Sequence, residues 1–273
     1  MNKPFPVLLA LIALTILCAC EPSKPQVTRI EISPSAPSKS SNVGAHPLNL
    51  GQTLFINGKF EWRDGILYIP KNYDSSKPLP LLVWLHGGGG SANEAEYMFP
   101  LADQFDIVIL AIDSRHNTWD GIDSPFGPDV EFIEKAMRYT FERVAIKADK
   151  IALGGISNGA SYSLALGRSN GDLFSHIVAA APWQLESPSA PIGKPKILVV
   201  HGTEDNVYPV LHSRKILVPS LKKKGYDVTY IEFDGPHWVP EEIVIKIFTW
   251  LLKSENDNNG APTSTKSEST KEE

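Results

Sequence analysis

The sequence predicts an α/β fold in which a mostly parallel central sheet is flanked by helices. Six short apolar runs are continuous rather than alternating, as is typical of strands that are covered on both faces. These runs lie at residues 81–85, 107–112, 151–156, 177–181, 197–200 and 228–233. Two further segments carry apolar residues at helical spacing, which predicts amphipathic helices packed on the sheet. Their apolar stripes are Val130, Ile133, Met137, Phe141 and Val144, and then Ile243, Ile247, Phe248 and Leu251.

The first strands are expected to be antiparallel. Residues 53–57 and 66–69 are two further strand candidates, and they lie on either side of the turn signal Asp64-Gly65. A turn of this kind joins antiparallel neighbours, so the otherwise parallel sheet should begin with antiparallel pairing.

Length and composition limit what the chain does. At 273 residues and 42% hydrophobic content, it is long enough and apolar enough to bury a sizeable core. With 26 basic and 31 acidic residues, the chain lacks the net positive charge typical of proteins that bind nucleic acids, so we expect no nucleic-acid partner. Cys18 and Cys20, the only cysteines, both lie in the first twenty residues. A disulfide framework or a cysteine-based metal site in the folded region is therefore excluded, and we expect neither a metal nor a cofactor.

The N-terminus indicates export. Residues 1–19 read as a signal peptide, because Lys3 precedes an apolar run at 7–17 that is too short to span a bilayer. The sequence Leu17-Cys18-Ala19-Cys20 resembles the lipobox of bacterial lipoproteins, in which a small residue precedes the lipidated cysteine. Cys20 fits that role, which predicts a membrane anchor on the extracytoplasmic side of the cell envelope. An ordinary secretory signal is the alternative.

Polar segments flank the predicted folded region. Residues 20–47 are rich in Ser, Pro, Lys and Asn and have few large apolar side chains, so we expect a disordered tether. Residues 254–273 form a similar polar tail that we also expect to be disordered, which leaves 48–253 as the folded domain.

A nucleophile motif lies between a strand and a helix. Gly155-Ile156-Ser157-Asn158-Gly159 satisfies G-x-S-x-G, follows the run at 151–156 and precedes a plausible helix. The glycines are needed because the serine sits on a sharp turn where a side chain at either neighbour would clash. Ser157 is therefore the candidate nucleophile.

A serine hydroxyl needs a general base and an acid that orients the base, and behind this motif they follow in the order serine, acid, histidine. His176, His201, His212 and His237 all follow Ser157. His201 precedes any suitable acid, and His212 follows the acid loop too closely. His237, just beyond the last strand, is the expected base. Asp205, after the run at 197–200, is the expected acid, with Glu204 as the nearest rival.

A third element is the run His86-Gly87-Gly88-Gly89-Gly90, directly after the strand at 81–85. Consecutive glycines mark a backbone that must approach something closely. This H-G-G loop, the G-x-S-x-G, H-G-x-x-D and a late G-x-H together resemble the α/β-hydrolase superfamily over residues 50–253. The short form resembles secreted esterases of the polyhydroxybutyrate-depolymerase, feruloyl-esterase and phospholipase/carboxylesterase group.

The resemblance implies a serine esterase that forms an acyl-enzyme on Ser157. It also implies an oxyanion hole from the backbone N–H groups of Asn158 and Gly88, with His86 holding the glycine loop. A serine peptidase of the same fold and a non-catalytic binding lipoprotein are the alternatives.

Substrate preference is predicted from two features. Only fourteen residues, 182–195, separate two strands where many lipases insert a cap, and four of them are proline. A capless, open site favours short-chain or small aromatic acyl esters, including those on polymers. Trp119, Trp183 and Trp238 fall in loops at the expected active end and are candidate substrate-binding residues.

Overall fold

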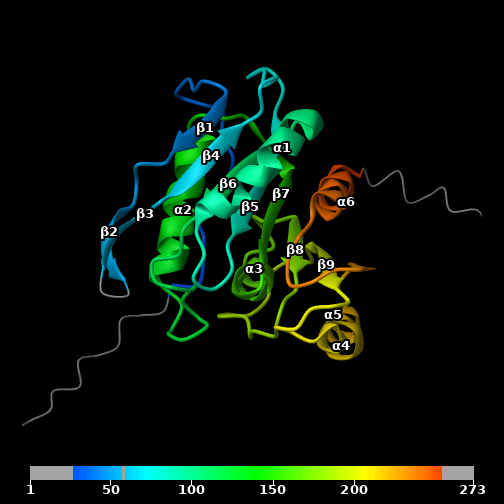
Figure 1. Ribbon diagram of the computed structural model, residues 1–273. Coiled ribbons are helices and arrows are strands. Elements are labelled where there is room, and N and C mark those ends of the chain that lie inside the picture. Colours follow the sequence, from blue (N-terminus) through cyan, green and yellow to red (C-terminus); the bar gives the residue numbers. More distant parts are fainter. Residues whose placement is uncertain (1–26, 57–58, 254–273) are drawn as a thin grey trace, which may run out of the picture.

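The computed structural model describes residues 27–56 and 59–253 (Figure 1). Among them, eight strands form one sheet in the order β1-β4-β6-β5-β7-β8-β9-β10. The bounds are β1 Gly44–Pro47, β4 Gly65–Ile69, β5 Leu79–Leu85, β6 Val108–Ile112, β7 Ile146–Ile156, β8 His176–Ala180, β9 Lys196–Gly202 and β10 Val228–Phe233. β4 is antiparallel to β1 and β6, and the pairs from β6 to β10 are parallel. The mostly parallel sheet with an antiparallel start is confirmed.

Helices cover both faces of this sheet. Their bounds are η1 Ala92–Met98, α1 Phe99–Phe105, α2 Pro128–Phe141, α3 Asn158–Ser169, α4 Val210–His212, η2 Ser213–Leu217, α5 Val218–Lys223 and α6 Glu241–Leu252. The strand β8 shows why its apolar run is continuous. Ile177 and Ala179 are buried against α3 and α5, whereas Val178 and Ala180 belong to the cluster that contains α6. Both faces of the strand need apolar side chains because both are covered.

The N-terminal strands differ from prediction in one pairing. β2, Gln52–Ile56, pairs with β3, Lys59–Arg63, in a separate two-stranded sheet, which forms the hairpin at the left of Figure 1. The turn signal Asp64-Gly65 lies where β3 gives way to β4. The sequence did not reveal β3 because its aromatic residues Phe60 and Trp62 alternate with charged ones and are exposed, so no continuous apolar run marks it.

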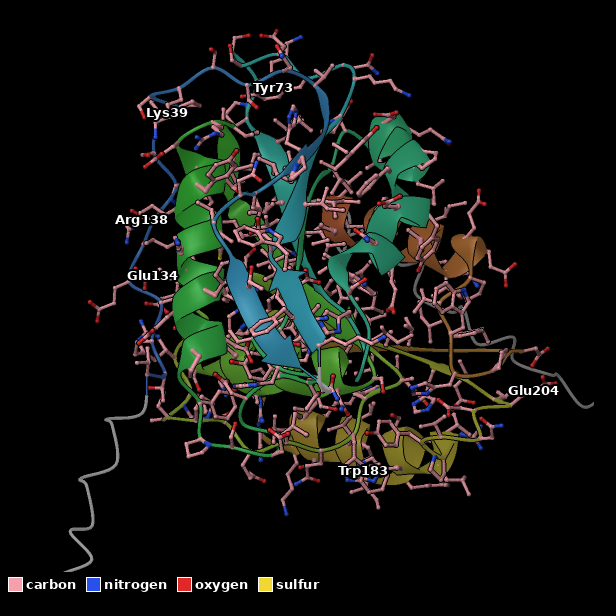
Figure 2. All side chains as sticks on the ribbon, turned by 60° about the vertical axis from the view of Figure 1, so that its left-hand side comes forward. Lys39, Tyr73, Glu134, Arg138, Trp183 and Glu204 are labelled. Carbon is pink, nitrogen blue, oxygen red and sulfur yellow. The ribbon has the colours of Figure 1, made fainter. Side chains whose placement is uncertain are left out.

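The prediction of a disordered tether over 20–47 is wrong from Val27 onward. Ile30 is buried, and its N–H donates to the Asn170 side chain over 2.9 Å. Figure 2 shows the segment running along α2, where Lys39 pairs with Glu142 at 2.5 Å. The segment is polar overall, but long-range hydrogen bonds to Asn170 and Asp172, together with burial of Ile30, order it. The folded domain therefore includes residues 27–47 and does not begin at 48.

Several predictions fall outside the described residues. They are the signal peptide at 1–19, lipidation at Cys20, the part of the tether at 20–26 and the polar tail at 254–273. Within the described ranges, no helix has both the length and the apolar character needed to cross a membrane.

The sheet gathers the candidate functional loops at one edge. Because β5, β7, β9 and β10 are parallel to their neighbours, their carboxyl ends lie on the same side of the sheet. The glycine run, Ser157, Asp205 and His237 directly follow or end these strands. Between β8 and β9, residues 181–195 contain neither helix nor strand, so no helical cap is inserted at this point of the described chain.

Candidate active site

Ser157 occupies a strained turn between β7 and α3. Its φ of 57° and ψ of −121° lie in a region that non-glycine residues rarely adopt. A Cβ added to Gly155 would lie 2.5 Å from the Leu85 carbonyl oxygen, and one added to Gly159 would lie 2.3 Å from the same atom. Both glycines are therefore required by close backbone contact with β5, as the motif predicts. The turn raises Ser157 above the end of the sheet.

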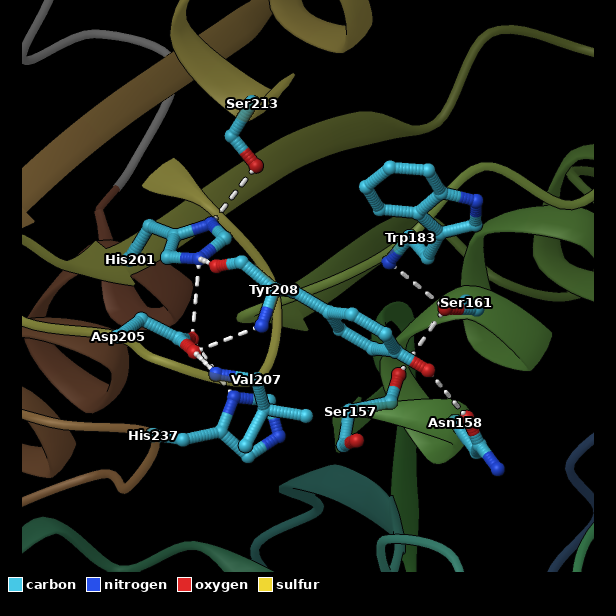
Figure 3. Close-up of polar contacts among 10 residues, drawn as sticks. All are labelled: Ser157, Asn158, Ser161, Trp183, His201, Asp205, Val207, Tyr208, Ser213 and His237. Atoms are coloured by element: carbon cyan, nitrogen blue, oxygen red, sulfur yellow. Dashed lines mark hydrogen bonds and ion pairs between the residues drawn. The ribbon is translucent and has the colours of Figure 1, made fainter. Parts of the chain in front are cut away.

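Asp205 and His237 meet in the loops that follow β9 and β10. The distance from His237 Nδ1 to Asp205 Oδ2 is 2.6 Å (Figure 3). An ionised carboxylate can only accept hydrogen bonds, so Nδ1 must carry the hydrogen. In the neutral imidazole, Nε2 then has a free lone pair. His237 Nε2 is buried and has no hydrogen-bond partner among the described residues. In Figure 3 the imidazole lies between the Asp205 carboxylate and the Ser157 side chain.

Three hydrogen bonds hold the Asp205 carboxylate. Oδ1 accepts the N–H groups of Val207 and Tyr208, each over 2.8 Å, and Oδ2 accepts from His237. His201 Nε2 also lies 3.1 Å from Oδ2. Burial alone would raise the pKa of this carboxyl, but the hydrogen bonds from His237, Tyr208 and Val207 outweigh burial and lower it. Asp205 is therefore ionised at neutral pH. The rival acid Glu204 is exposed (Figure 2).

His201 is fully buried beneath the acid. Its Nε2 faces two acceptors, Asp205 Oδ2 and the Tyr208 carbonyl oxygen at 2.9 Å, so this nitrogen carries a hydrogen. Its Nδ1 lies 2.8 Å from the Ser213 hydroxyl. The buried histidine thus ties Asp205 to the start of η2 and is not placed as a base. His176 lies at the opposite end of the sheet, at the start of β8.

The glycine run lies over the nucleophile turn. A Cβ added to Gly87 would be 3.5 Å from the Ser157 Cβ, and one added to Gly88 would be 2.8 Å from Asn158 Nδ2. His86 holds the base of this loop: Nδ1 contacts the Gly87 carbonyl oxygen at 2.6 Å, and Nε2 accepts the Ser114 N–H at 3.0 Å. Burial lowers the pKa of His86 to about 4, so it is neutral and suited to this pair of bonds.

Sequence reasoning missed the residues that surround the Asn158 side chain. Asn158 Nδ2 donates to the Thr118 hydroxyl over 2.9 Å, and Asn158 Oδ1 accepts from the Tyr208 hydroxyl over 2.9 Å. Asn158 is also the first residue of α3, so its backbone N–H has no intrahelical acceptor. Tyr208 lies three positions after Asp205 in the same loop, and this proximity to the predicted acid was the sequence feature that could have marked it as a site residue.

The three candidate tryptophans have different positions. Trp119 is fully buried and donates its indole N–H to the His86 carbonyl oxygen over 2.9 Å, so its prediction as a substrate-binding residue is wrong. Trp183 is 43% exposed, stacks on His212 with ring centroids 3.9 Å apart, and lies beside Tyr208. Trp238 is 45% exposed and packs on Tyr97, with ring centroids 5.2 Å apart.

The fold and this arrangement define an α/β-hydrolase of the serine esterase class. The sequence profile of the phospholipase/carboxylesterase family matches residues 105–253, more than half of the chain. The chain belongs to that family and is a carboxylesterase-like hydrolase.

Individual relatives of known description share only about a quarter of their aligned residues with this chain. A "Probable feruloyl esterase C" of Aspergillus oryzae is 26% identical over 203 residues, which cover 70% of this chain and 74% of the relative. A second, from Aspergillus flavus, is 25% identical over 177 residues, covering 61% and 64% of the two chains.

Solved structures share the fold at lower identity. The fluorophosphonate-binding serine hydrolase F of Staphylococcus aureus has a TM-score of 0.58 at 14% identity, over 78% of this chain and all of its own. A CE1 ferulic acid esterase of Anaeromyces mucronatus has a TM-score of 0.54 at 20% identity, over 85% and 95% of the two chains.

Proposed function

We propose that this chain hydrolyses carboxylic esters through an acyl-enzyme on Ser157, with His237 as general base and Asp205 as the acid that orients it. The observation that carries the proposal is the 2.6 Å bond from His237 Nδ1 to Asp205 Oδ2, because it leaves Nε2 able to accept a proton on the side of Ser157. No hydrogen bond joins Ser157 Oγ to His237 among the described residues, and such contacts are often looser without substrate.

The mechanism follows from these positions. Ser157 Oγ attacks the ester carbonyl carbon while its proton passes to His237 Nε2, and Asp205 stabilises the imidazolium. The proton then passes to the leaving alkoxide, which departs as the alcohol. Water attacks the acyl-enzyme with His237 again as base, and this step releases the acid and restores the Ser157 hydroxyl.

The oxyanion in both steps is assigned to the N–H groups of Asn158 and Gly88. Support comes from the position of Asn158 at the N-terminus of α3, where backbone N–H groups and the helix dipole favour negative charge. Gly88 lies against the Asn158 side chain, and the neighbouring Gly87 lies against the Ser157 Cβ, so the glycine run is beside the nucleophile.

The proposed substrates carry short-chain or small aromatic acyl groups, on polymers among other carriers. The absence of helix and strand from 181–195 supports an open site that can admit a bulky alcohol. Trp183 is exposed and packs on the partly buried rings of His212 and Tyr208, so its ring is available to a planar acyl group, while a long alkyl chain would find little enclosed wall. The names of the Aspergillus and Anaeromyces relatives agree with an aromatic acyl group.

A panel of chromogenic esters from acetyl to dodecanoyl, with feruloyl esters and aryl amides alongside, tests the proposal. We expect kcat/KM to be highest for acetyl to butyryl or feruloyl esters, low for amides, and not raised by emulsified lipid. Trp183→Ala and Trp238→Ala should raise KM for feruloyl esters if these residues bind the acyl group. Trp62→Ala, at an exposed tryptophan on β3, is the matched control. An optimum at dodecanoyl would contradict the proposed substrate class.

We also propose that the protein is exported and anchored through lipid on Cys20, on the extracytoplasmic side of a bacterial membrane. The support is the sequence pattern of residues 1–20 alone. Metabolic labelling with a fatty-acid analogue should label the wild-type protein and leave Cys20→Ser unlabelled. Label on the Cys20→Ser protein would contradict this anchor.

A further inference from the structure

Tyr208 contacts three separate parts of the candidate active site. Its backbone N–H donates to Asp205 Oδ1 over 2.8 Å, and its carbonyl oxygen accepts from His201 Nε2 over 2.9 Å. Its hydroxyl donates to Asn158 Oδ1 over 2.9 Å. Figure 3 shows the ring spanning the distance from the Asp205 loop to the start of α3. One residue thus joins the acid to the residue that is assigned to the oxyanion hole.

We propose that Tyr208 is a positioning residue that fixes Asn158 relative to the Asp205–His237 pair, an inference that rests on the proposed function. The Asn158 amide is held at both ends, with Nδ2 on the Thr118 hydroxyl and Oδ1 on the Tyr208 hydroxyl. The amide also lies against the backbone of Gly88. These three contacts limit rotation of the Asn158 side chain and so restrain its backbone N–H.

The direction of the Tyr208 bond follows from the other end of the amide. Nδ2 is the donor group of Asn158 and faces Thr118, which leaves the carbonyl oxygen Oδ1 toward Tyr208. Oδ1 can only accept, so the phenol hydroxyl must donate. Replacing the tyrosine by phenylalanine therefore removes one specific bond and leaves Oδ1 without it.

The ring of Tyr208 has a second contact. It meets the His237 imidazole edge-on, with centroids 5.5 Å apart and an interplanar angle of 87°, and it lies 5.6 Å from the Trp183 ring. These contacts do not involve the hydroxyl. Tyr208→Phe keeps them, together with both backbone hydrogen bonds, so the variant isolates the link to Asn158.

Kinetics of Tyr208→Phe on a chromogenic acetyl ester test the inference, with a phenylboronic acid as the analogue of the tetrahedral intermediate. The Tyr208–Asn158 bond positions the backbone N–H of Asn158, which would donate to the negative charge that develops in the transition state. Loss of the Tyr208 hydroxyl should therefore lower kcat rather than raise KM. We expect kcat to fall about five- to tenfold, KM to change less than about twofold, and the boronate Ki to rise by the same factor as kcat falls.

Two further variants separate positioning from general loss of structure. Thr118→Val removes the other bond of the Asn158 amide, and the double variant should deviate from additivity because both bonds act on one side chain. Tyr226→Phe is the matched control: its hydroxyl is buried without a hydrogen-bond partner among the described residues. We expect it to leave kcat and Ki unchanged.

Each outcome bears on a different claim. Wild-type kcat and Ki in Tyr208→Phe would overturn the inference, while loss of turnover in Ser157→Ala would still support the proposed function. A fall in kcat without a matching rise in Ki, or one accompanied by a large drop in melting temperature, would also overturn the inference. A wild-type chain that neither hydrolyses ester nor binds the boronate would overturn the proposed function and the inference with it.

Discussion

Replacing Asp205 by Asn should be at least as damaging to activity as replacing it by Ala, although Asn has nearly the same shape. All four groups that face the carboxylate are donors: two backbone N–H groups, His237 Nδ1 and His201 Nε2. An amide has one acceptor oxygen and an NH2 group that must face two of these donors. If the oxygen keeps the backbone N–H groups, the NH2 group faces His237 Nδ1.

The imidazole then pairs with that NH2 group only by moving its hydrogen from Nδ1 to Nε2. In this tautomer His237 cannot accept the Ser157 proton. A wrong tautomer of this kind costs roughly 10⁴ in kcat, or about 5 kcal/mol of transition-state stabilisation. Ala leaves space and loses the carboxylate charge, but does not impose this tautomer.

The assay is kcat/KM on an acetyl ester for wild type, Asp205→Asn and Asp205→Ala, with melting temperatures recorded for each. Asp234→Asn is the matched control, since this exposed carboxylate accepts a bond from the Thr203 hydroxyl and should tolerate the change within about twofold. If Asp205→Asn kept more than about a tenth of wild-type activity, the tautomer argument and the assignment of the acid would both be refuted.

Three other predictions concern the framework of the site. Gly159→Ala places a Cβ 2.3 Å from the Leu85 carbonyl oxygen and should cost about 1–3 kcal/mol in urea unfolding; unchanged stability would contradict the close-contact argument. Trp119→Phe should destabilise the fold by about 1–3 kcal/mol, because it leaves the His86 carbonyl oxygen unpaired, without changing KM; a raised KM would restore Trp119 as a substrate contact. Burial lowers the pKa of His176 to about 4, below its ordinary value of 6.5, so the unfolded chain binds that proton first as pH falls. Stability from His176 is thus present above about pH 6.5 and is lost toward pH 4. The free energy of unfolding should therefore fall with pH in this range, and His176→Gln should reduce that slope by up to about 1.4 kcal/mol per pH unit. An unchanged slope would show that His176 does not contribute.

The sheet could be predicted because its strands are buried on both faces. Such strands appear as continuous apolar runs whose recognition needs no knowledge of tertiary contacts, and β5 and β7 are clear instances. Ser157, Asp205 and His237 could be predicted for a related reason: the carboxyl ends of parallel strands meet, so the chain order of strands and loops places all three at one edge. Local pattern and topology were sufficient for these elements.

The loop after β6 could not be predicted in the same way. Trp119 was expected to bind substrate because it falls in this loop at the active end of the sheet, yet it is buried. Asp120 accepts the N–H groups of Gly127 and Asp129, and Asp129 accepts those of Arg115 and Asp120. Two buried carboxylates thus supply the bonds that water would otherwise make, which allows a polar loop to fold inward. Nothing in its composition distinguishes this from an exposed loop.

Long-range polar contacts also explain the two remaining differences. The segment from Val27 is ordered by bonds to Asn170 and Asp172, more than a hundred positions away. Tyr208 is tied to Asn158 across fifty positions, and only the fold brings them together. A sequence pattern reports the neighbours of a residue along an element, whereas these contacts depend on where separate elements meet.

Covalent labelling with a fluorophosphonate probe tests the central claim most directly, since the probe reacts with an activated serine and leaves a mass that can be located. The account predicts one adduct per chain, found by peptide mass spectrometry on the peptide that contains Ser157, with ester hydrolysis lost in proportion to labelling. Ser157→Ala should show neither adduct nor turnover while keeping the wild-type melting temperature. An adduct on another residue, or ester hydrolysis retained by Ser157→Ala, would contradict the assignment of Ser157 as the nucleophile.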